Sequence, residues 1–467
     1  MKRIISYRRA VFAGIAAMIA LSGCGSTASD STSAQTTTAA ATTAATTTAT
    51  EWTGDDIEVE ALDEEETLDV DIKGKKLKWL GFYDLNPTND SPERSPELAL
   101  FEDTYGAKIE YIQTSNETRF DDLATLIMSG DSPDIFVYEW RSFPFDISKK
   151  QYQPIDSIID WNEPKWADVK DIADSFIYKG EHYIAPLGYA FSDTQVLMYN
   201  KTLVEEEGLE DPYELYLKGE WDWDRFTGMM NEFVGGDEER YGIGGWWANA
   251  FVYTAGETIV RYDGTNFINN IRSTNIEKAQ SVIKEIYRNG LVERGWIGGE
   301  SAFTDDHLLF YSMGTWAYNA AALSRPDDEI QIVPFPKNPD TDKYYVSNKI
   351  SSYMWVSGSK NDDLVKAWFD CCRTVNYEDS YKQATKDKFL KNNEGWTSEM
   401  YDIAMDFYDS SKFTQAYDYG YGLNMDMSDI VMPMLYEGIV NEQFEDWVQA
   451  REEYYSIVQE SCDAYNE

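Results

Sequence analysis

The sequence predicts a mixed α/β fold built on open, largely parallel sheets. Between residues 77 and 138, short apolar segments alternate with amphipathic ones in the order strand, helix, strand, helix, strand. Parallel strands need long crossovers, and helices in those crossovers cover both faces of the sheet. The chain from about residue 75 to residue 467 is too long for one small core, so two lobes are expected.

Each element of this stretch has its own signal. Apolar runs predict buried strands at its two ends, and alternating residues predict the strand between them. Ligands of such sheets bind at the carboxyl ends of the strands. In chain order, the expected elements are a strand over 77–82, a helix with Leu98, Leu100 and Phe101 that closes at Tyr105, Gly106 and Ala107, a strand over 108–113, a helix with Phe120, Leu123 and Ile127 that stops at Gly130, and a strand over 135–138.

The first 23 residues resemble the signal of a bacterial lipoprotein. Basic residues precede an uncharged stretch over 10–23, which is too short to span a bilayer. Residues 21–24, Leu-Ser-Gly-Cys, match a lipobox, which implies cleavage before Cys24 and attachment of diacylglycerol to its sulfur. Two or more acyl chains anchor a protein stably to a membrane. An ordinary cleaved signal with a chance cysteine stays open as the alternative.

Residues 24–74 are expected to form a linker. Over 25–50 almost every residue is Ser, Thr, Ala, Gly or Gln, and Asp30 carries the only charge. Over 55–71 acids occur without any base. The first segment cannot bury enough apolar surface to fold, and self-repulsion extends the second. The acids lack the spacing of a calcium loop, so no metal is expected there.

The charge of the chain limits its partners. It carries 83 acidic and 40 basic residues, and the signal holds four of the bases, so the mature form has 83 acids, 36 bases and a net charge of −47. Such a surface repels nucleic acid, anionic lipid and acidic polymers, which favours a neutral or cationic ligand. The 15 Trp and 32 Tyr residues supply flat apolar faces with polar edges. This combination indicates carbohydrate.

The cysteines beyond Cys24 are expected to be buried free thiols. Cys371 and Cys372 fall on the apolar stripe of a predicted helix, and Cys462 extends a stripe through Phe444, Trp447, Val448, Arg451, Tyr455 and Val458. The spacing fits no zinc or thioredoxin-like site. A disulfide to Cys462 is the alternative outside the cell.

Other conspicuous residues receive no functional assignment. His182 and His307 are isolated in the sequence, and no zinc-protease, esterase, Walker or dinucleotide motif is present. We therefore expect no cofactor, no metal and no catalytic residue. Trp221 and Trp223 in the string EWDWD are assigned to packing, beside an aspartate that caps a helix.

Several strings of the chain resemble the extracellular solute-binding proteins of ABC importers, in the branch that includes maltodextrin-binding protein. Each string alone is weak evidence for the family, but the order and spacing of the strings together are specific to it. The strings cover the chain from Leu77 to about Lys366. The strings are FEDTYGAKIEYI, LATLIMSGDSPDIFVYE, QPIDSIID, YKGEHYIAPLGYAFSDTQVLMYNKTLVEEEGL, GEWDWDRF, LLFYSMGTWAYNAA and QIVPFPKNPD.

The resemblance implies a periplasmic-binding-protein-like fold of type II, in which two discontinuous α/β lobes are joined by a hinge. The chain is expected to cross the hinge near 187–193 and near 344–353. Closure around a ligand is general behaviour for periplasmic binding proteins. The implied N-terminal lobe holds residues 75–190 and 344–378, and the implied C-terminal lobe holds residues 191–343 and 379–467.

A sugar site needs aromatic rings for the sugar faces and carboxylates or amides for the hydroxyls. By resemblance, Trp316 in GTWAYN matches a position where tryptophan stacks on sugar, Trp247 lies nearest the family's aromatic position, and Asp193 matches a hinge-side acid. Packing is the alternative for each candidate. The ends of the predicted strands add Tyr83, Asp84, Tyr138, Glu139 and Trp140, with Arg141 as the base beside them. A turn at Gly244 and Gly245 adds Trp246, and the second crossing adds Tyr353 and Trp355.

These observations predict a lipid-anchored receptor on the outer face of the cytoplasmic membrane. It is expected to be a monomer that captures a neutral saccharide, in particular an oligosaccharide, and delivers it to the transmembrane subunits of an ABC permease. A surface glycoside hydrolase or lyase stays open, because sequence does not give the separation of two carboxylates. An adhesin for insoluble polysaccharide also stays open, and peptides and polyamines are the alternative ligands.

Overall fold

The computed structural model describes residues 67–89, 92–236, 239–393 and 395–466. The described residues all belong to one compact unit. The predicted signal, Cys24 and most of the predicted linker lie outside the described residues. Within the described part, no helix combines the length and the apolar character needed to cross a membrane.

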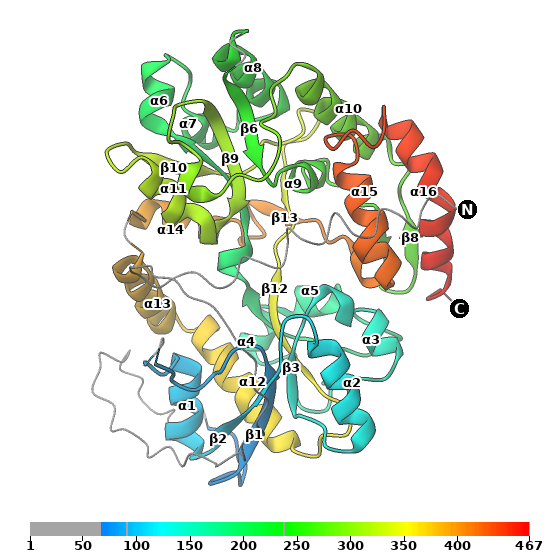
Figure 1. The fold of residues 1–467 in the computed structure, drawn as a ribbon. Helices are drawn as coiled ribbons and strands as arrows, with labels where there is room; N and C mark the ends of the chain where they lie inside the picture. The colour runs from blue at the N-terminus through cyan, green and yellow to red at the C-terminus, as the bar shows by residue number, and fades with distance from the viewer. Residues whose placement is uncertain (1–66, 90–91, 237–238, 394, 467) are drawn as a thin grey trace, which may run out of the picture. The chain divides into compact units, whose positions relative to one another are not determined.

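A five-stranded sheet forms the centre of the first lobe (Figure 1). In spatial order its strands are β2 (Lys108–Gln113), β1 (Lys76–Gly81), β3 (Ile135–Val137), β12 (Ile350–Trp355) and β4 (Ala185–Tyr189). β1 pairs in parallel with β2 and β3, whereas β12 runs antiparallel to β3 and β4. The expected, largely parallel sheet is confirmed, with β12 as its reversed strand.

Two crossover helices connect the first three strands. α1 (Pro96–Tyr105) begins after Ser95, whose hydroxyl accepts a hydrogen bond from the Leu98 amide, and it ends at Gly106 with a φ of 64°. α2 (Arg119–Ser129) likewise ends at Gly130. Glycine adopts this left-handed conformation readily because it lacks a Cβ atom. The elements expected between residues 77 and 138 are all present, and the strand ends agree to within one residue.

A four-stranded sheet forms the centre of the second lobe. In spatial order its strands are β10 (Ile330–Val333), β5 (Gln195–Asn200), β9 (Leu308–Gly314) and β6 (Tyr241–Gly245). β6 and β9 are parallel, and β5 runs antiparallel to β9 and β10. In each sheet, the reversed strand is the one that the chain enters on arriving from the other sheet.

The described chain passes between the two sheets three times. β4 leads into β5 through residues 190–194, and β10 returns through β11 (Tyr344–Val346) to β12. α12 (Asp362–Tyr377) packs on α1 and β4, whereas α14 (Ser398–Asp406) packs on β10, so the third passage lies between these helices. β13 (Phe413–Gln415) pairs with β11 beside the second passage. The lobe boundaries given from the sequence stay a prediction.

The remaining elements surround the sheets. A hairpin of β7 (Val260–Tyr262) and β8 (Phe267–Asn269) contacts α16 (Trp447–Asp463). α8 (Trp223–Val234) packs against β6. The other α-helices are α3 (Phe145–Ser148), α4 (Pro164–Ala167), α5 (Lys170–Asp174), α6 (Lys201–Glu206), α7 (Pro212–Leu217), α9 (Ala248–Tyr253), α10 (Thr274–Arg288), α11 (Tyr318–Ser324), α13 (Asp379–Asn392) and α15 (Met432–Glu437).

Two apolar clusters hold the fold together. One lies within the first lobe and includes the fully buried rings of Trp79 and Trp368. The other cluster extends from the first lobe to the C-terminal part of the chain. In this cluster, the centre of the Phe143 ring lies 5.9 Å from the ring centres of both Phe267 and Tyr419. Full burial of such a side chain contributes about 1.5–3 kcal/mol. The lobes are therefore joined by apolar packing as well as by the three passages of the chain.

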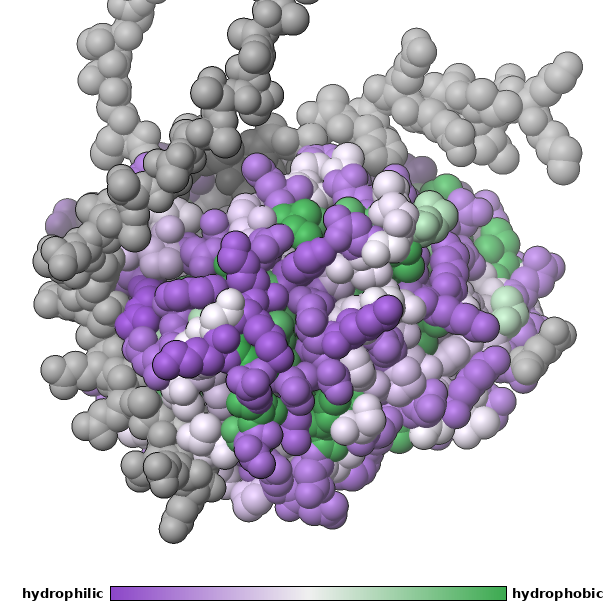
Figure 2. Space-filling model, turned by 90° about the horizontal axis from the view of Figure 1, so that it is seen from below, coloured by the Kyte–Doolittle hydropathy of each residue, from purple (hydrophilic) through white to green (hydrophobic). Residues whose placement is uncertain are grey.

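The surface of the molecule is mostly polar. Figure 2 shows hydrophilic side chains over most of the face seen there, with small apolar patches between them. This surface agrees with the acidic composition of the chain, whose formal net charge is −43.

The cysteines of the described residues, Cys371, Cys372 and Cys462, are buried free thiols. The alternative disulfide to Cys462 is therefore contradicted, whereas the buried stripe of α12 is confirmed. The stripe expected before Cys462 is wrong at its start, because Phe444 precedes α16 and Val448 is exposed. α16 begins after Asp446, which caps it, and Trp447 and Val458 of the expected stripe are buried.

Trp221 and Trp223 have the packing role expected for them. The Trp221 indole donates a hydrogen bond to the Pro334 carbonyl and the Trp223 indole donates one to the Thr254 hydroxyl, both at 2.8 Å. Asp222 caps α8 by accepting a hydrogen bond from the Arg225 amide. Both rings are buried, so neither belongs to a binding surface.

Candidate ligand-binding site

Exposed aromatic side chains gather where strands of both sheets end. Tyr83 follows β1, Trp140 follows β3, Trp246 follows β6 and Trp316 follows β9. Their exposed fractions lie between 38% and 56%. Carboxyl ends of strands are where ligands of α/β sheets bind, and large exposed apolar groups mark binding surfaces. The strand ends are therefore the candidate site.

The Trp316 ring is held close to the first passage between the lobes. The Thr315 amide donates a hydrogen bond to the Thr194 carbonyl at 3.0 Å, and the Thr315 hydroxyl donates one to the Phe191 carbonyl. A Cβ atom on Gly314 would lie 2.7 Å from the indole and 3.0 Å from the Ser192 carbonyl oxygen. The indole therefore lies over Gly314, with one side available to a ligand.

Trp246 leaves β6 through a turn that requires glycine. Gly245 has a φ of 81°, and a Cβ atom there would lie 2.3 Å from the Ser312 carbonyl oxygen. The Trp246 amide donates a hydrogen bond to that oxygen at 2.8 Å. The Gln195 side chain, which belongs to β5, donates a hydrogen bond to the Trp246 carbonyl and crosses β9 to do so. The Trp246 backbone is thus fixed by two neighbouring strands.

The structure adds Trp296, which the sequence reasoning missed. Val292 pairs in parallel with Ile243 of β6, so the chain leaves the sheet edge in the direction of that strand. Three residues separate Val292 from Trp296, and the exposed fraction of Trp296 is 56%. Two features of the sequence could have indicated Trp296. The apolar pair before Glu293 resembles the end of a strand, and the glycine before Trp296 resembles a turn.

Four of the residues predicted for the site are buried in this structure. Trp247 is 3% exposed at the start of α9 and packs against Phe251. Tyr138 packs against Phe176, and Tyr353 lies between Trp79 and Phe369. Trp355 is buried in the same cluster as Tyr353. None of these rings offers a free face, so we assign all four to packing.

The Glu139 carboxylate is hydrogen-bonded to a residue that the sequence did not indicate. Both of its carboxylate oxygens accept hydrogen bonds from Arg119, and the guanidinium group of Arg119 also lies 4.4 Å from the Phe120 ring centre. The expected neighbour, Arg141, instead forms an ion pair with the buried Asp146 at 3.2 Å. Arg119 begins α2, twenty residues before Glu139. No local pattern in the sequence joins the two.

Asp146 should make stability depend on pH. Burial raises the pKa of Asp146 from 3.8 to about 6, against the opposing effect of Arg141. Because the folded pKa is raised, the stabilising contribution is complete below about pH 4 and is lost as the pH rises through about 6. From this group we expect the free energy of unfolding to fall by about 2–3 kcal/mol across that range.

Urea unfolding at pH values from about 4 to 7 measures this dependence. Asp146→Asn should make it shallower but not flat, because burial also raises the pKa of Asp418 to about 6. Asp379→Asn, at a fully exposed carboxylate, should leave it unchanged. An equal slope in wild type and Asp146→Asn would contradict the prediction.

The acidic candidates lie at the passages and at the end of β1. Asp193 in the first passage forms an ion pair with Lys349, just before β12, at 3.2 Å. Asp84 accepts hydrogen bonds from the amide and the side chain of Asn86 through one oxygen, so its other oxygen is available to a ligand. Burial of the Tyr83 hydroxyl raises the pKa of Tyr83 to about 12.

The arrangement suits recognition of a polar, uncharged molecule. Ring faces are available, acids stand beside them, and the cations Arg119 and Lys349 already have carboxylate partners. Neither histidine is near: His182 contacts Asp156 and Asp174, and His307 contacts Glu293. Within the described ranges, no group of three or more His, Cys, Asp or Glu side chains is placed to hold a metal ion.

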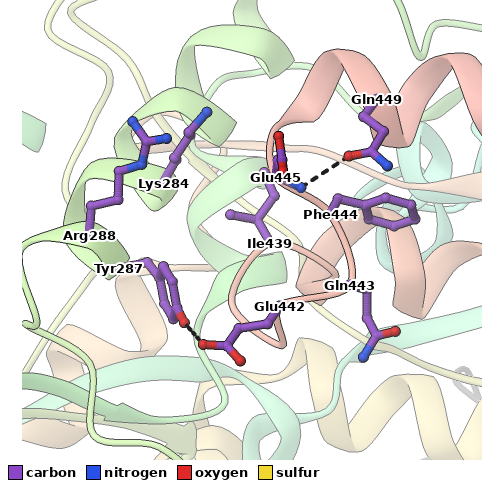
Figure 3. Close-up of a pocket in the computed structure, with 9 residues that line it drawn as sticks. All are labelled: Lys284, Tyr287, Arg288, Ile439, Glu442, Gln443, Phe444, Glu445 and Gln449. Atoms are coloured by element: carbon purple, nitrogen blue, oxygen red, sulfur yellow. Dashed lines mark hydrogen bonds between the residues drawn. The ribbon is translucent and has the colours of Figure 1, made fainter.

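A cavity of about 520 Å³ is lined by none of the exposed rings at the strand ends (Figure 3). Lys284, Tyr287 and Arg288 of α10 form one wall, and residues 439–445 with Gln449 of α16 form the other. Tyr287 donates a hydrogen bond to Glu442 across one end. The lining is polar, and it includes none of the residues predicted for binding. We therefore locate the site at the strand ends, where the exposed rings gather.

Comparison with known proteins identifies the family. The family described as bacterial extracellular solute-binding protein matches residues 88–375, well over half of the chain. The chain belongs to this family. The resemblance found in the sequence is thereby confirmed, and the family places this solute-binding protein outside the cytoplasm. No curated protein sequence matches the chain.

Solved structures confirm the two-lobed fold of this solute-binding protein. The sugar-binding protein MalE from Xanthomonas citri is similar with a TM-score of 0.60 and 15% identity, covering 83% of this chain and 98% of its own. A cyclo/maltodextrin-binding protein complexed with maltotetraose gives 0.57 and 18%, covering 82% and 96%. A substrate-binding protein from Listeria monocytogenes in complex with cycloalternan gives 0.56 and 16%, covering 84% and 98%. The predicted type II fold is confirmed.

Proposed function

We propose that this protein is a lipid-anchored receptor that captures a carbohydrate, in particular an oligosaccharide, and delivers it to an ABC permease. The exposed rings at the ends of strands in both sheets carry the proposal. Aromatic faces stack on the C–H faces of sugars, and each good aromatic contact adds about 0.5–1.5 kcal/mol beyond burial of area. Two structural neighbours were solved with saccharides bound, which supports this ligand class.

In the proposed complex, the aromatic rings stack on sugar rings and the acids accept hydrogen bonds from sugar hydroxyls. Trp246, Trp296 and Trp316 of the second lobe stack on sugar rings, and Trp140 does so from the first lobe. Sugar hydroxyls donate hydrogen bonds to the free oxygen of Asp84 and to Asp193, which exchanges Lys349 for the ligand. The ring of Tyr83 closes the first-lobe side.

The anchor and the partner follow from the sequence and the family. We propose that Cys24 carries the lipid, that residues 24–74 give the folded part reach from the outer face of the cytoplasmic membrane, and that a monomer closes over ligand about the passages at 190–194 and 347–349. The closed form then binds the transmembrane subunits of the permease.

A surface glycoside hydrolase or lyase is less well supported. A glycosidase needs one carboxyl group that donates a proton and a second that acts as nucleophile or base. Glu139 has both oxygens occupied by Arg119, which leaves it no free oxygen for either role. Membership in a family of binding proteins also favours capture over turnover.

A thermal-shift screen tests the ligand class. We expect maltotetraose, cycloalternan or another neutral oligosaccharide to raise the melting temperature, because ligand at 100 times its Kd stabilises the folded state by about 2.7 kcal/mol. We expect a Kd in the micromolar range, about −8 kcal/mol.

The same screen includes spermidine and a mixed tripeptide set. Stabilisation by these alone would replace the carbohydrate with a polyamine or peptide. New reducing ends after incubation with a stabilising glycan would replace the receptor with an enzyme, and binding to insoluble glycan alone would favour an adhesin.

A further inference from the structure

Phe82 is a further exposed ring at the carboxyl end of β1. It is the last residue of the strand expected over 77–82, but β1 ends at Gly81, and the exposed fraction of Phe82 is 42%. The Thr114 amide donates a hydrogen bond to the Gly81 carbonyl at 3.0 Å. The Trp79 indole donates one to the Tyr83 carbonyl, also at 3.0 Å. The backbone is therefore held on both sides of this exposed side chain.

The guanidinium group of Arg119 lies over the Phe82 ring. Its central carbon is 5.9 Å from the centre of that ring and 4.4 Å from the centre of the Phe120 ring. A cation within about 6 Å of a ring centre is attracted to the face of the ring. The Tyr83 ring is nearly perpendicular to the Phe82 ring, at 78°, with the ring centres 5.3 Å apart. Two neighbours therefore contact the Phe82 ring, and its exposed part stays open to a ligand.

Glu139 holds Arg119 in this place. Both carboxylate oxygens of Glu139 accept hydrogen bonds from the Arg119 guanidinium group, and each of the two side chains is only 13% exposed. Such a two-point contact fixes the orientation of the planar guanidinium group. Arg119 begins α2 after β2, Phe82 follows β1 and Glu139 follows β3. Because β1 pairs in parallel with both β2 and β3, the carboxyl ends of three strands meet at Arg119.

Attachment of α2 does not depend on the Arg119–Glu139 pair. The side chains of Phe120 and Leu123 are buried and hold the helix against the core, where the centre of the Phe120 ring lies 5.9 Å from that of Phe136. An ion pair withdrawn from water contributes little net stability, because the cost of desolvation offsets the attraction. The distinctive result of this pair is a guanidinium group fixed beside an exposed ring.

We propose that Phe82 is a further sugar-stacking residue of the site and that the Arg119–Glu139 pair positions its ring. The inference rests on the proposed function. Phenylalanine has no polar atom, so its ring suits the apolar C–H face of a sugar, and Asp84 has a free carboxylate oxygen for a hydroxyl two residues further on. A ring that is ordered before the ligand arrives loses less entropy on binding.

The first test needs no ligand. In protein whose phenylalanines carry ¹³C at Cζ, the Phe82 signal is assigned by its absence in Phe82→Leu, and its NMR order parameter measures the freedom of the ring. A variant with both Arg119→Met and Glu139→Gln, called the neutral variant, leaves no unpaired charge. It should lower this order parameter toward the flexible range, below about 0.6. An order parameter equal to that of wild type would overturn the positioning role, whatever the ligand proves to be.

The second test measures binding of maltotetraose, or of the glycan with the largest shift in the screen. Phe82→Ala should weaken binding about 5- to 10-fold, the range expected for loss of one aromatic contact, and Phe82→Tyr should stay within about 2-fold of wild type. The neutral variant should weaken binding about 2- to 5-fold, and it should have no further effect in a Phe82→Ala background, because the pair acts through that ring.

A matched control carries Arg240→Met and Glu207→Gln. The Arg240 guanidinium group lies 4.7 Å from the centre of the Phe233 ring and pairs with Glu207 at 2.8 Å. This arginine therefore has the same two kinds of contact as Arg119, but it stands just before β6, at the opposite end of that strand from Trp246. The control should retain the wild-type Kd.

The outcomes separate the inference from the proposed function. Full affinity in Phe82→Ala would remove Phe82 from the site while leaving saccharide capture intact. An equal loss from the neutral variant with and without Phe82→Ala would show that the pair does not act through Phe82. If wild type binds no glycan of the screen, the proposed function and the stacking role of Phe82 both fail, and the order parameter still decides whether the pair positions the ring.

Discussion

Replacing Trp316 with alanine is expected to weaken saccharide binding at least about 10-fold without unfolding the protein. The ring is 56% exposed and lies over Gly314, so a ligand that stacks on it buries much of its face. Loss of that burial and of the aromatic contact removes about 1.5–2 kcal/mol, which corresponds to about 10- to 30-fold in Kd. An exposed ring contributes little to folding, so the free energy of unfolding should change by less than about 0.5 kcal/mol.

Calorimetric titration with the best glycan of the screen measures this change. Val448→Ala is the matched control, because Val448 is an exposed apolar side chain on α16 and not at a strand end. The control should retain the wild-type Kd. Full affinity in Trp316→Ala would remove Trp316 from the site.

Arg373→Met should destabilise the protein by about 3–5 kcal/mol. The Arg373 guanidinium group is buried on α12, where it donates hydrogen bonds to the Lys165 carbonyl at 2.6 Å and the Leu187 carbonyl at 2.7 Å. It also forms an ion pair with Asp168. Methionine fills a similar volume but leaves the two carbonyls without this donor, and each unsatisfied buried acceptor costs about 1–3 kcal/mol, whereas the Asp168 carboxylate, which is 53% exposed, is solvated by water.

Urea unfolding compares Arg373→Met with Arg225→Met. Arg225 pairs with Glu210 at 2.7 Å, but both side chains are at least half exposed, so its loss should cost no more than about 1 kcal/mol. Equal stability losses in the two variants would show that Arg373 does not hold β4 to α12. Because Leu187 lies in β4, just before the first passage, Arg373 also supports the hinge.

The sequence predicted the elements that depend on local patterns. The strands and helices between residues 77 and 138, the capping role of Asp222 and the buried thiols of α12 each follow from periodicity or from capping chemistry. The two-lobed fold followed from the order of the family strings. Trp316 was indicated by the match of GTWAYN to the family position, and Trp246 by the glycine turn that precedes it.

The remaining features depend on contacts between distant residues. Trp246 and Trp247 are adjacent, but only the structure shows that Trp247 starts α9 and turns into the core. Arg119 at the start of α2 pairs with Glu139 after β3, although twenty positions separate them, and Arg373 of α12 donates a hydrogen bond to the carbonyl of Leu187 in β4. The pattern of neighbouring residues in the sequence carries no information about such pairs.

A crystal structure with the glycan that stabilises the protein most would test the central claim most directly. The account predicts that the glycan lies at the strand ends, stacked on Trp316 and Trp246, with hydroxyl groups near Asp84 or Asp193. A glycan bound instead in the cavity between α10 and residues 439–445, with the rings at the strand ends free, would contradict it.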